Sequence, residues 1–567
     1  MPVLRVPAIR GLTDRPEHAA PGLAGDCLNI DLSEATGRGR DGSVFHGAAA
    51  NRLTQIGSST DNYLAGLWHF RSRSGVLHEI RAVCQDDGAY LAETRYGLVG
   101  AAVATFQPAS ADMDHTRMWS GVEFAGQFVM ATHYDAGNDN TTLALFDPNT
   151  HWQRITAEDR TTNPLHGSLI LHGIDGDDQG PYLEQAPKGT LLAVHSDRLF
   201  TAGLPDEHDS FRYSNLSDPS GWPANNVVRI ATRDGEGIKA MAPLGRNLVF
   251  FKRRSIHVAT FLSQYDAQVR DVVQGVGCVH HASVANTGGL LVFLGEEDVH
   301  AFDGAQTINL SDPVDKTKSN IAKRLKALRG RFDQAVGRYY RSRHQYWLSL
   351  PAGGVRDGLA GEVLFILDMQ TGEWSEYQFS AANFGVRAMS TVLNEDGREM
   401  LVLGGHFETT TGGSNVTAAW FLRADFGDVD AGIDGDVNLT RRWESAQLVL
   451  GEHRPMRFKS VRPVFGQTFE GDVRVYWRLD HETRTAAEGF DQFADIDALG
   501  DYDPKRASLF GEATWSRSRW SDVDPHSDRL HMRGAVGKVI RVGFETTGVH
   551  AFDLRSLQVD AESAGSW

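Results

Sequence analysis

The chain has 567 residues, of which 41% are hydrophobic and 23% charged, and its formal net charge is −17 at pH 7. This length exceeds one ordinary domain, so we expect two or three domains with sizeable cores. The acidic balance argues against a general nucleic-acid binder, because phosphate recognition needs basic surface, but it leaves room for a local basic patch.

The cysteines are few and lie far apart. Cys27, Cys84 and Cys278 match no metal-ligand spacing, so we expect no disulfide framework and predict folding in the cytoplasm. The N-terminal residues lack the apolar core of a signal peptide, and no apolar run approaches the ~20 residues of a membrane span. The sequence therefore predicts neither ordinary secretion nor a membrane-spanning segment.

Residues 1–50 are rich in residues that interrupt regular structure, and we predict an extended N-terminal arm. The interrupting residues are Pro2, Pro7, Gly11, Pro16, Pro21, Gly22 and Gly25. Such a segment either drapes over the surface of its own chain or grips a neighbouring molecule. The sequence leaves both possibilities open.

From residue 51 to 430, short apolar runs alternate with turn residues. Runs such as 248–251 are cut off by Gly, Asp, Asn or Pro about every 8 to 12 residues, a rhythm typical of an all-β sandwich, barrel or propeller. Residues 345–350 also alternate as a half-buried strand should. Further candidate strands are residues 66–70, 126–131 and 400–404.

A turn motif recurs within this region. Asp147 and Asp368 each follow an apolar residue, precede a Thr by three residues, and are followed by a Trp that restarts a strand. Asp303 begins a shortened version. Asp and Thr side chains bond to nearby backbone groups in such turns, so we predict hairpins that join the outer strands of propeller blades. The uneven spacing indicates irregular blades, six to eight in number.

One helix interrupts the β pattern near residues 316–331. Ile321, Leu325 and Leu328 have helical spacing and are surrounded by cations. Such a cluster is either a solvated helix face or a docking surface for acidic protein or passing DNA. The candidate interaction residues are Lys316, Lys318, Lys323, Arg324, Lys326, Arg329 and Arg331.

An acidic, glycine-rich linker at 424–438 marks the boundary of a last domain. Beyond it, residues 472–477 and 539–544 alternate clearly between apolar and polar side chains. We therefore predict a C-terminal β-sandwich over residues 440–567. The predicted class is all-β: a propeller with irregular blades and one inserted basic helix, followed by this sandwich.

The sequence contains no catalytic signature, so we do not predict an enzyme. It has no Gly-x-Ser-x-Gly, Walker loop or dinucleotide fingerprint, and residues 217–222 only approach the sialidase box, with the wrong spacing. His280 and His281 are adjacent, and on a strand they would point to opposite faces. A metal site at this pair is therefore not expected.

Calcium is the best inorganic candidate, and no other cofactor is expected. Asp175, Asp177 and Gln179 begin like an EF-hand loop with Gly180 at position six, but Ala186 stands where a bidentate Glu belongs. The linker carboxylates offer a second weak calcium site. They are Asp428, Asp430, Asp434 and Asp436.

The order of motifs over residues 197–313 resembles the β-propeller tail proteins of short-tailed bacteriophages, known as nozzle, tail hub or stabilisation proteins. The resembling pieces include Asp197 to Gly203, a strand holding Lys252, the run 288–295 and Phe302 to Gly304. Residues 526–567 resemble the C-terminal domain of the same proteins. The resemblance provides no catalytic residue.

This resemblance implies a virion structural protein that folds in the host cytoplasm and resides in the phage tail. Such proteins form a hexameric ring below portal and adaptor, complete the DNA-ejection channel and anchor tail fibres, so genomic DNA meets them only in transit. The main alternative is a propeller glycosidase or glycan-binding protein acting on host surface polysaccharide. A cellular kelch-like adaptor would need more regular repeats than this chain has.

Overall fold

The computed structural model describes most of the chain, with gaps. The described residues are 3–6, 8–15, 19–32, 37–41, 43–45, 62–85, 90–96, 102–106, 119–131, 143–147, 151–154, 187, 189–205, 207–219, 221–230, 235–261, 267–315, 317–351, 363–379, 384–393, 397–411, 414–424, 438–449, 455–465, 472–479, 493–497, 530–532, 536–548 and 553–564.

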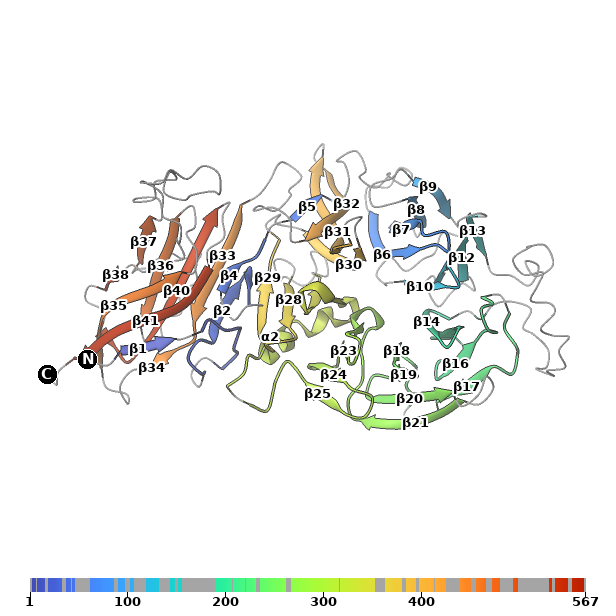
Figure 1. Cartoon of the computed structure of the whole chain (residues 1–567), viewed down its shortest axis with the longest axis horizontal. Helices are drawn as coiled ribbons and strands as arrows, with labels where there is room; N and C mark the ends of the chain where they lie inside the picture. Colours follow the sequence, from blue (N-terminus) through green and yellow to red (C-terminus); the bar gives the residue numbers. More distant parts are fainter. Residues whose placement is uncertain are drawn as a thin grey trace, which may run out of the picture.

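The described residues form a propeller of seven blades, which occupies the right of Figure 1: six blades are separate four-stranded antiparallel sheets, and the four antiparallel strands of blade 6 belong to a larger sheet. Blade 1 consists of β6 (Asn62–Arg71), β7 (Leu77–Gln85), β8 (Tyr90–Tyr96) and β9 (Ala102–Phe106). Blade 2 consists of β10 (Ser120–Phe124), β11 (Gln127–Ala131), β12 (Leu143–Asp147) and β13 (His151–Arg154). Blade 3 consists of β14 (Leu191–His195), β15 (Arg198–Ala202), β16 (Ser210–Tyr213) and β17 (Val227–Arg229).

The remaining blades follow in chain order until the last one. Blade 4 consists of β18 (Ala240–Leu244), β19 (Asn247–Phe251), β20 (Ser255–Phe261) and β21 (Ala267–Gln274). Blade 5 consists of β22 (Ala285–Asn286), β23 (Leu291–Leu294), β24 (Val299–Phe302) and β25 (Thr307–Asn309). Blade 6 consists of β26 (Val336–Tyr340), β27 (Gln345–Leu350), β28 (Val363–Asp368) and β29 (Trp374–Tyr377), and blade 7 consists of β30 (Phe384–Leu393), β31 (Glu399–Thr411), β32 (Ser414–Ala424) and β5 (Ser43–Phe45).

The ring closes between blade 7 and blade 1. The innermost strand of each blade contacts that of the next blade, and β30 contacts β6. The outer strand of blade 7 comes from the N-terminal region, where β5 pairs with β32 through Leu422 opposite Phe45. The predicted all-β propeller is therefore confirmed, and the residues that the structure describes form seven blades.

Blade 4 shows why these sequences form strands with little alternation. Leu248 and Phe250 of β19 pack toward blade 3, while Val249 and Phe251 pack toward blade 5. Because both faces of an inner strand are covered, consecutive residues are apolar. This explains the run Leu248–Phe251 that the sequence shows.

The three predicted turns connect the third and fourth strands of their blades, as expected. In blade 6 the Asp368 Oδ1 atom accepts hydrogen bonds from the amides of Gln370 (2.9 Å) and Thr371 (2.7 Å). In blade 5 the Asp303 Oδ1 atom accepts from the amides of Ala305 and Gln306, each at 2.8 Å. The side chain thus stabilises each turn locally.

The second unit is a sandwich of two sheets at the left of Figure 1, where both ends of the chain lie. Its C-terminal strands are β33 (Leu439–Ser445), β34 (Leu448–Val449), β35 (Met456–Phe465), β36 (Asp472–Leu479), β37 (Phe493–Asp497), β38 (Leu530–His531), β39 (Val536–Gly537), β40 (Val539–Gly548) and β41 (Asp553–Ser563). The predicted C-terminal sandwich is confirmed, but strands from the N-terminal region complete it.

Residues 1–50, expected to form an extended arm, contribute to both units. The strands are β1 (Val3–Val6), β2 (Ala24–Leu28), β3 (Ile30–Asp31) and β4 (Gly37–Gly39), in addition to β5. β1 and β4 pair with β41, and β2 pairs with β33. Val6, Leu12 and Ile30 are fully buried, so this region is part of the core and not draped over the surface.

One ten-stranded sheet runs from blade 6 into the sandwich. β2 continues the sheet beside β29, in parallel register with Leu28 opposite Glu376. The Asn29 amide adds a hydrogen bond of 2.7 Å to the Glu376 carbonyl. The propeller and the sandwich therefore share backbone hydrogen bonds across their boundary.

The inserted basic helix is shorter than predicted. Helix α2 covers only Ala322–Ala327 and is followed by a 3₁₀ turn at Arg329–Gln334. The residues before it bond to the N-terminal region instead of continuing the helix: the Asn320 amide donates to the Leu12 carbonyl (2.9 Å) and the Ser319 hydroxyl donates to the same oxygen (2.7 Å). Within the described residues, no helix is long and apolar enough to cross a membrane.

Candidate functional site

The predicted interaction residues around α2 divide into structural and exposed groups. Arg324 lies against the N-terminal region, where it pairs with Asp14 at 3.0 Å and donates to the Gly25 carbonyl at 2.7 Å. Arg331 is buried and bonds to the Leu350 carbonyl at 3.5 Å. These two cations join parts of the fold, a role that helical spacing alone did not reveal.

The other predicted cations lie at the surface. Lys318, Lys323 and Lys326 are exposed, and Arg329 lies 3.6 Å from Glu297. Lys316 lies outside the described residues. A cavity of 230 Å³ is lined by Lys323, Lys326 and Arg329 on one side and by acidic residues on the other. These acidic residues are Asp14, Glu296, Glu297, Asp298 and Asp312.

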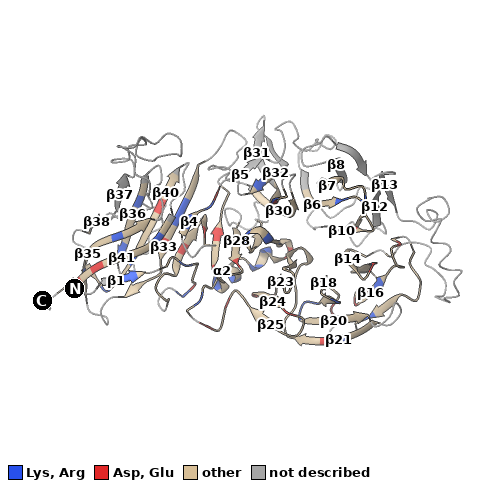
Figure 2. Ribbon diagram, viewed as in Figure 1, with Lys and Arg blue, Asp and Glu red and all other residues tan. Residues whose placement is uncertain are grey.

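The charges around α2 are therefore balanced. In Figure 2 the charged residues of α2 itself are Lys and Arg, and the acidic residues of the cavity come from other segments of the chain. Exposed ion pairs of this kind contribute little stability, about 0–1 kcal/mol each, and stay available for exchange with charges on another protein.

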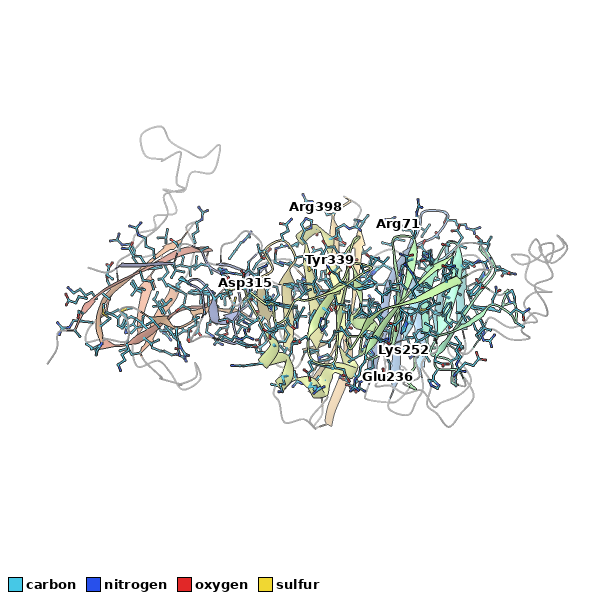
Figure 3. The ribbon with its side chains drawn as sticks, turned by 90° about the horizontal axis from the view of Figure 1, so that it is seen from below. Arg71, Glu236, Lys252, Asp315, Tyr339 and Arg398 are labelled. Atoms are coloured by element: carbon cyan, nitrogen blue, oxygen red, sulfur yellow. The ribbon has the colours of Figure 1, made fainter. Side chains whose placement is uncertain are left out.

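A larger cavity of 1160 Å³ opens at one end of the central channel. It lies where the inner strands turn into the second strands of their blades, the side marked by Arg71 and Arg398 in Figure 3, opposite Lys252 and Glu236. Blades 2 to 4 contribute apolar lining, and blades 6 and 7 contribute cations. The cationic residues are Arg338, Arg341, Arg343 and Arg398.

This channel mouth was not predicted from the sequence. Its lining comes from six blades, so the residues are scattered along the chain. A local signal nevertheless exists, because residues 338–343 read Arg-Tyr-Tyr-Arg-Ser-Arg. Interleaved arginines and tyrosines at the end of an inner strand place cations and aromatic rings at a channel opening.

A Ser–His–Glu arrangement lies between blades 7 and 1. His69 Nδ1 is 2.8 Å from the Ser390 hydroxyl, and its Nε2 is 2.9 Å from Glu79. A hydrolase triad also places a His between a Ser and a carboxylate, but there the Ser bonds to Nε2 and the carboxylate to Nδ1, the reverse of the partners seen here. All three side chains are buried, however, and Glu79 also pairs with buried Arg81, so a substrate could not reach Ser390. The arrangement joins two blades.

Other reactive or metal-binding groups are also built into the core. Burial raises the pKa of the Cys278 thiol to about 11, which leaves it protonated and unreactive at neutral pH. Lys252, on the turn after β19, is buried and donates to the Ile230 carbonyl at 3.0 Å. Neither residue is a candidate for catalysis.

The adjacent residues His280 and His281 do not lie on a β-strand. His281 begins a 3₁₀ turn and its ring centroid lies 4.7 Å from that of His280, so the expectation of opposite faces is wrong. Even so, the part of the chain that the structure describes holds no group of three or more potential metal ligands. The calcium candidates Asp175, Asp177 and Gln179, and those of the linker, lie outside the described residues.

Comparisons with known proteins return propellers of diverse kinds. Similar solved structures include the Pan2 WD40 domain of Neurospora crassa (8% identity, TM-score 0.35, 68% of this chain and 94% of that one). Another is an acylaminoacyl peptidase of Pyrococcus horikoshii (10% identity, TM-score 0.35, 68% of this chain and 57% of that one). A third is the β-propeller domain of the Trilobed protease from Pyrococcus furiosus (9% identity, TM-score 0.35, 64% of this chain and 94% of that one).

No protein-family model matches the chain, and no curated protein matches it. At these identities and TM-scores, the similarity to the solved structures does not support any inference about the activity of this chain. The assignment of the fold therefore rests on the strand pairing of the chain itself, which closes seven blades into a ring.

Proposed function

We propose that this chain is a structural subunit of a bacteriophage tail, whose propeller and sandwich serve assembly rather than catalysis. The observation that carries the proposal is the sheet shared by the two units, because a subunit of a closed ring must hold its contact surfaces at a fixed angle. Domains joined only by a linker would move relative to each other.

The resemblance to phage tail proteins supports the same reading. Its strongest segment, residues 197–313, corresponds to β15 through β25 and so spans most of three consecutive blades. Residues 526–567 hold the last strands of the sandwich, including β40 and β41. The resemblance therefore involves both units that the shared sheet connects.

In this proposal about six copies form a ring beneath the portal and adaptor, with tail fibres attached around it and DNA passing through. The net charge of −17 suits a conduit that repels DNA and lets it slide. The exposed lysines of α2 would contact acidic residues of an adjacent protein. The virion tail is the corresponding location.

The test is the molar mass of the purified chain by light scattering, alone and with a portal–adaptor complex. We expect a ring of about six copies, formed alone or upon docking. A strict monomer that ignores the complex would contradict the proposal, and binding or cleavage of host polysaccharide would favour the glycan-directed alternative.

A matched pair of variants sharpens this test. Lys326→Glu changes an exposed cation of α2, and Lys239→Glu makes the same change of charge at an exposed site before blade 4. We expect Lys326→Glu to weaken docking several-fold in a salt-dependent manner and Lys239→Glu to leave it unchanged. Equal effects would show that α2 is not the contact.

A further inference from the structure

We propose that the mouth of the central channel binds an anionic small molecule, with Arg338 holding a carboxylate or phosphate group of the ligand against an apolar opposite wall. This site is independent of the assembly role. It lies inside the propeller ring, at the cavity of 1160 Å³, and involves none of the residues around α2.

Arg338 is a cation without a matching anion. It lies half-buried on the innermost strand of blade 6, and its guanidinium donates to the Thr391 hydroxyl of blade 7 at 3.1 Å. Among the described residues, no carboxylate lies within ion-pair distance of it. A partly desolvated charge with only a neutral partner is costly, and a bound anion would offset that cost.

The electrostatics of Arg338 agree with this geometry. Burial lowers the pKa of Arg338, while the nearby charge of Glu399 acts in the opposite direction. The guanidinium nevertheless stays protonated at neutral pH, because an arginine begins from a very high pKa. It therefore presents a permanent positive charge to the cavity.

A second cation lies at the rim. Arg341 is exposed, lines the cavity, and has no carboxylate within ion-pair distance in the described part of the chain. Arg343 differs, because it pairs with Asp31 at 2.8 Å and Asp41 at 3.0 Å and so faces the N-terminal region. Arg338 and Arg341 are therefore the arginines of blade 6 that line the cavity with no carboxylate among the described residues within ion-pair distance, and an oxyanion can accept several charged hydrogen bonds.

The opposite wall determines the kind of ligand. Val122, Val194 and Pro243 line the cavity from blades 2, 3 and 4. Small-molecule sites combine a mostly apolar lining with a few placed polar groups and have volumes of about 300–1,000 Å³, so this cavity is large enough for such a ligand and some water. An oxyanion attached to an apolar body matches both walls.

Two carboxylates also line the cavity and limit its positive potential. Glu399 accepts a hydrogen bond from the Ser342 amide at 2.7 Å, which holds its carboxylate at the wall. Burial raises the pKa of Glu123, so its charged form is disfavoured there. Removing the charge of Glu399 should therefore strengthen the binding of an anion.

Isothermal titration with three ligands of similar shape tests the site. We expect phenyl phosphate and phenylacetate to bind the full chain, and the neutral analogue benzyl alcohol to bind about tenfold more weakly or not at all. Comparing the two anions distinguishes a phosphate site from a carboxylate site. If neither anion binds better than benzyl alcohol, the proposal is wrong.

Variants identify the residue responsible. Arg338→Met should weaken anion binding about tenfold or more, whereas Arg246→Gln, an exposed arginine on the same side of the ring but outside the cavity, should leave it unchanged. Equal binding by wild type and Arg338→Met would overturn the assignment.

A second variant, expected to increase anion affinity, tests the proposal if Arg338→Met does not fold. Glu399→Gln retains an acceptor for the Ser342 amide but removes the negative charge, so it should increase the affinity for both anions about threefold or more. Unchanged or weaker binding by folded Glu399→Gln would contradict the proposed electrostatics.

Discussion

The chain joins distant segments at two places, and the two joints use different chemistry. At the seam between blades 7 and 1, buried polar groups meet: His69 contacts Ser390 and Glu79, and Glu79 pairs with Arg81. At the junction of blade 6 with the sandwich, fully buried Trp374 and Trp443 pack in the largest apolar core.

This difference indicates that the polar seam determines which blades pair, whereas the apolar junction provides stability. A buried ion pair is about as stable as a well-packed apolar pair of the same shape, but it accepts only one arrangement of its partners. The seam must bring two particular blades together, so a demanding polar network suits it. The junction must resist separation of two units, so buried aromatic area suits it.

The largest expected effect is at the junction. Trp443→Ala should lower the free energy of unfolding by about 3–5 kcal/mol, because it empties a buried site beside Phe544 and removes the donor to the Arg10 carbonyl. Urea denaturation followed by tryptophan fluorescence and circular dichroism measures the loss. A loss below about 1 kcal/mol would mean that the junction is not held by packing.

At the seam, Glu79→Gln should cost about 3 kcal/mol, because it removes one partner of the buried Glu79–Arg81 ion pair while the Arg81 charge stays buried over the Phe421 ring. The double variant Glu79→Gln/Arg81→Met should recover most of this loss, since it removes both charges. Thermal unfolding of the single and double variants compares them. If the double variant is less stable than Glu79→Gln, the seam does not behave as an ion pair in an apolar setting.

A backbone contact at the junction allows a sharper test. A Cβ atom at Gly11 would lie 2.4 Å from the Trp374 carbonyl oxygen and 2.7 Å from its amide nitrogen. Gly11→Ala should therefore destabilise the chain by about 2 kcal/mol, because neither backbone group can move without breaking the shared sheet. Gly330→Ala is the matched control, since nothing lies within 4 Å of its added Cβ. Equal melting temperatures for the two variants would refute the close approach.

The smallest expected effect depends on pH. Burial, assisted by the charge of Asp26, raises the pKa of Glu376 beside the junction. The native state then holds this proton more tightly than the unfolded state, so ionised Glu376 destabilises the fold at pH values above its raised pKa. This penalty fades as the pH falls through the raised pKa towards the ordinary pKa of a glutamate.

Glu376→Gln should accordingly raise the melting temperature slightly at pH 7 and lose that advantage in acid. Glu297→Gln makes the same change of charge at a side chain that is 73% exposed and serves as the control. A lower melting temperature for Glu376→Gln at pH 7 would show that its carboxylate has a stabilising partner.

Local features of the fold could be predicted from the sequence because their causes lie within a few residues. The strand predicted at 345–350 is β27, and the turns at Asp303 and Asp368 occur where their hydrogen-bonding side chains indicate them. In each case neighbouring residues supply both the apolar pattern and the turn chemistry.

Long-range pairing and the channel mouth could not be predicted in this way. Prolines and glycines in residues 1–50 argue against helices but do not show which strand edges will accept short extended segments such as β2. Likewise, Arg338 can bind a ligand only together with apolar residues from other blades. These residues are far apart in the sequence and line one cavity only because the blades close into a ring. Tertiary context also shortened α2, since Ser319 and Asn320 bond to Leu12.

The position of the N-terminal strands has a consequence for synthesis on the ribosome. Arg40 donates to the carbonyl of Gln378, which lies 338 positions later in the chain. At ~5–20 residues per second, the first segment waits roughly 20 to 70 s before that partner is made. During this interval its apolar residues have no core to enter, so the nascent chain needs a chaperone or a temporary contact until translation reaches the closing blade.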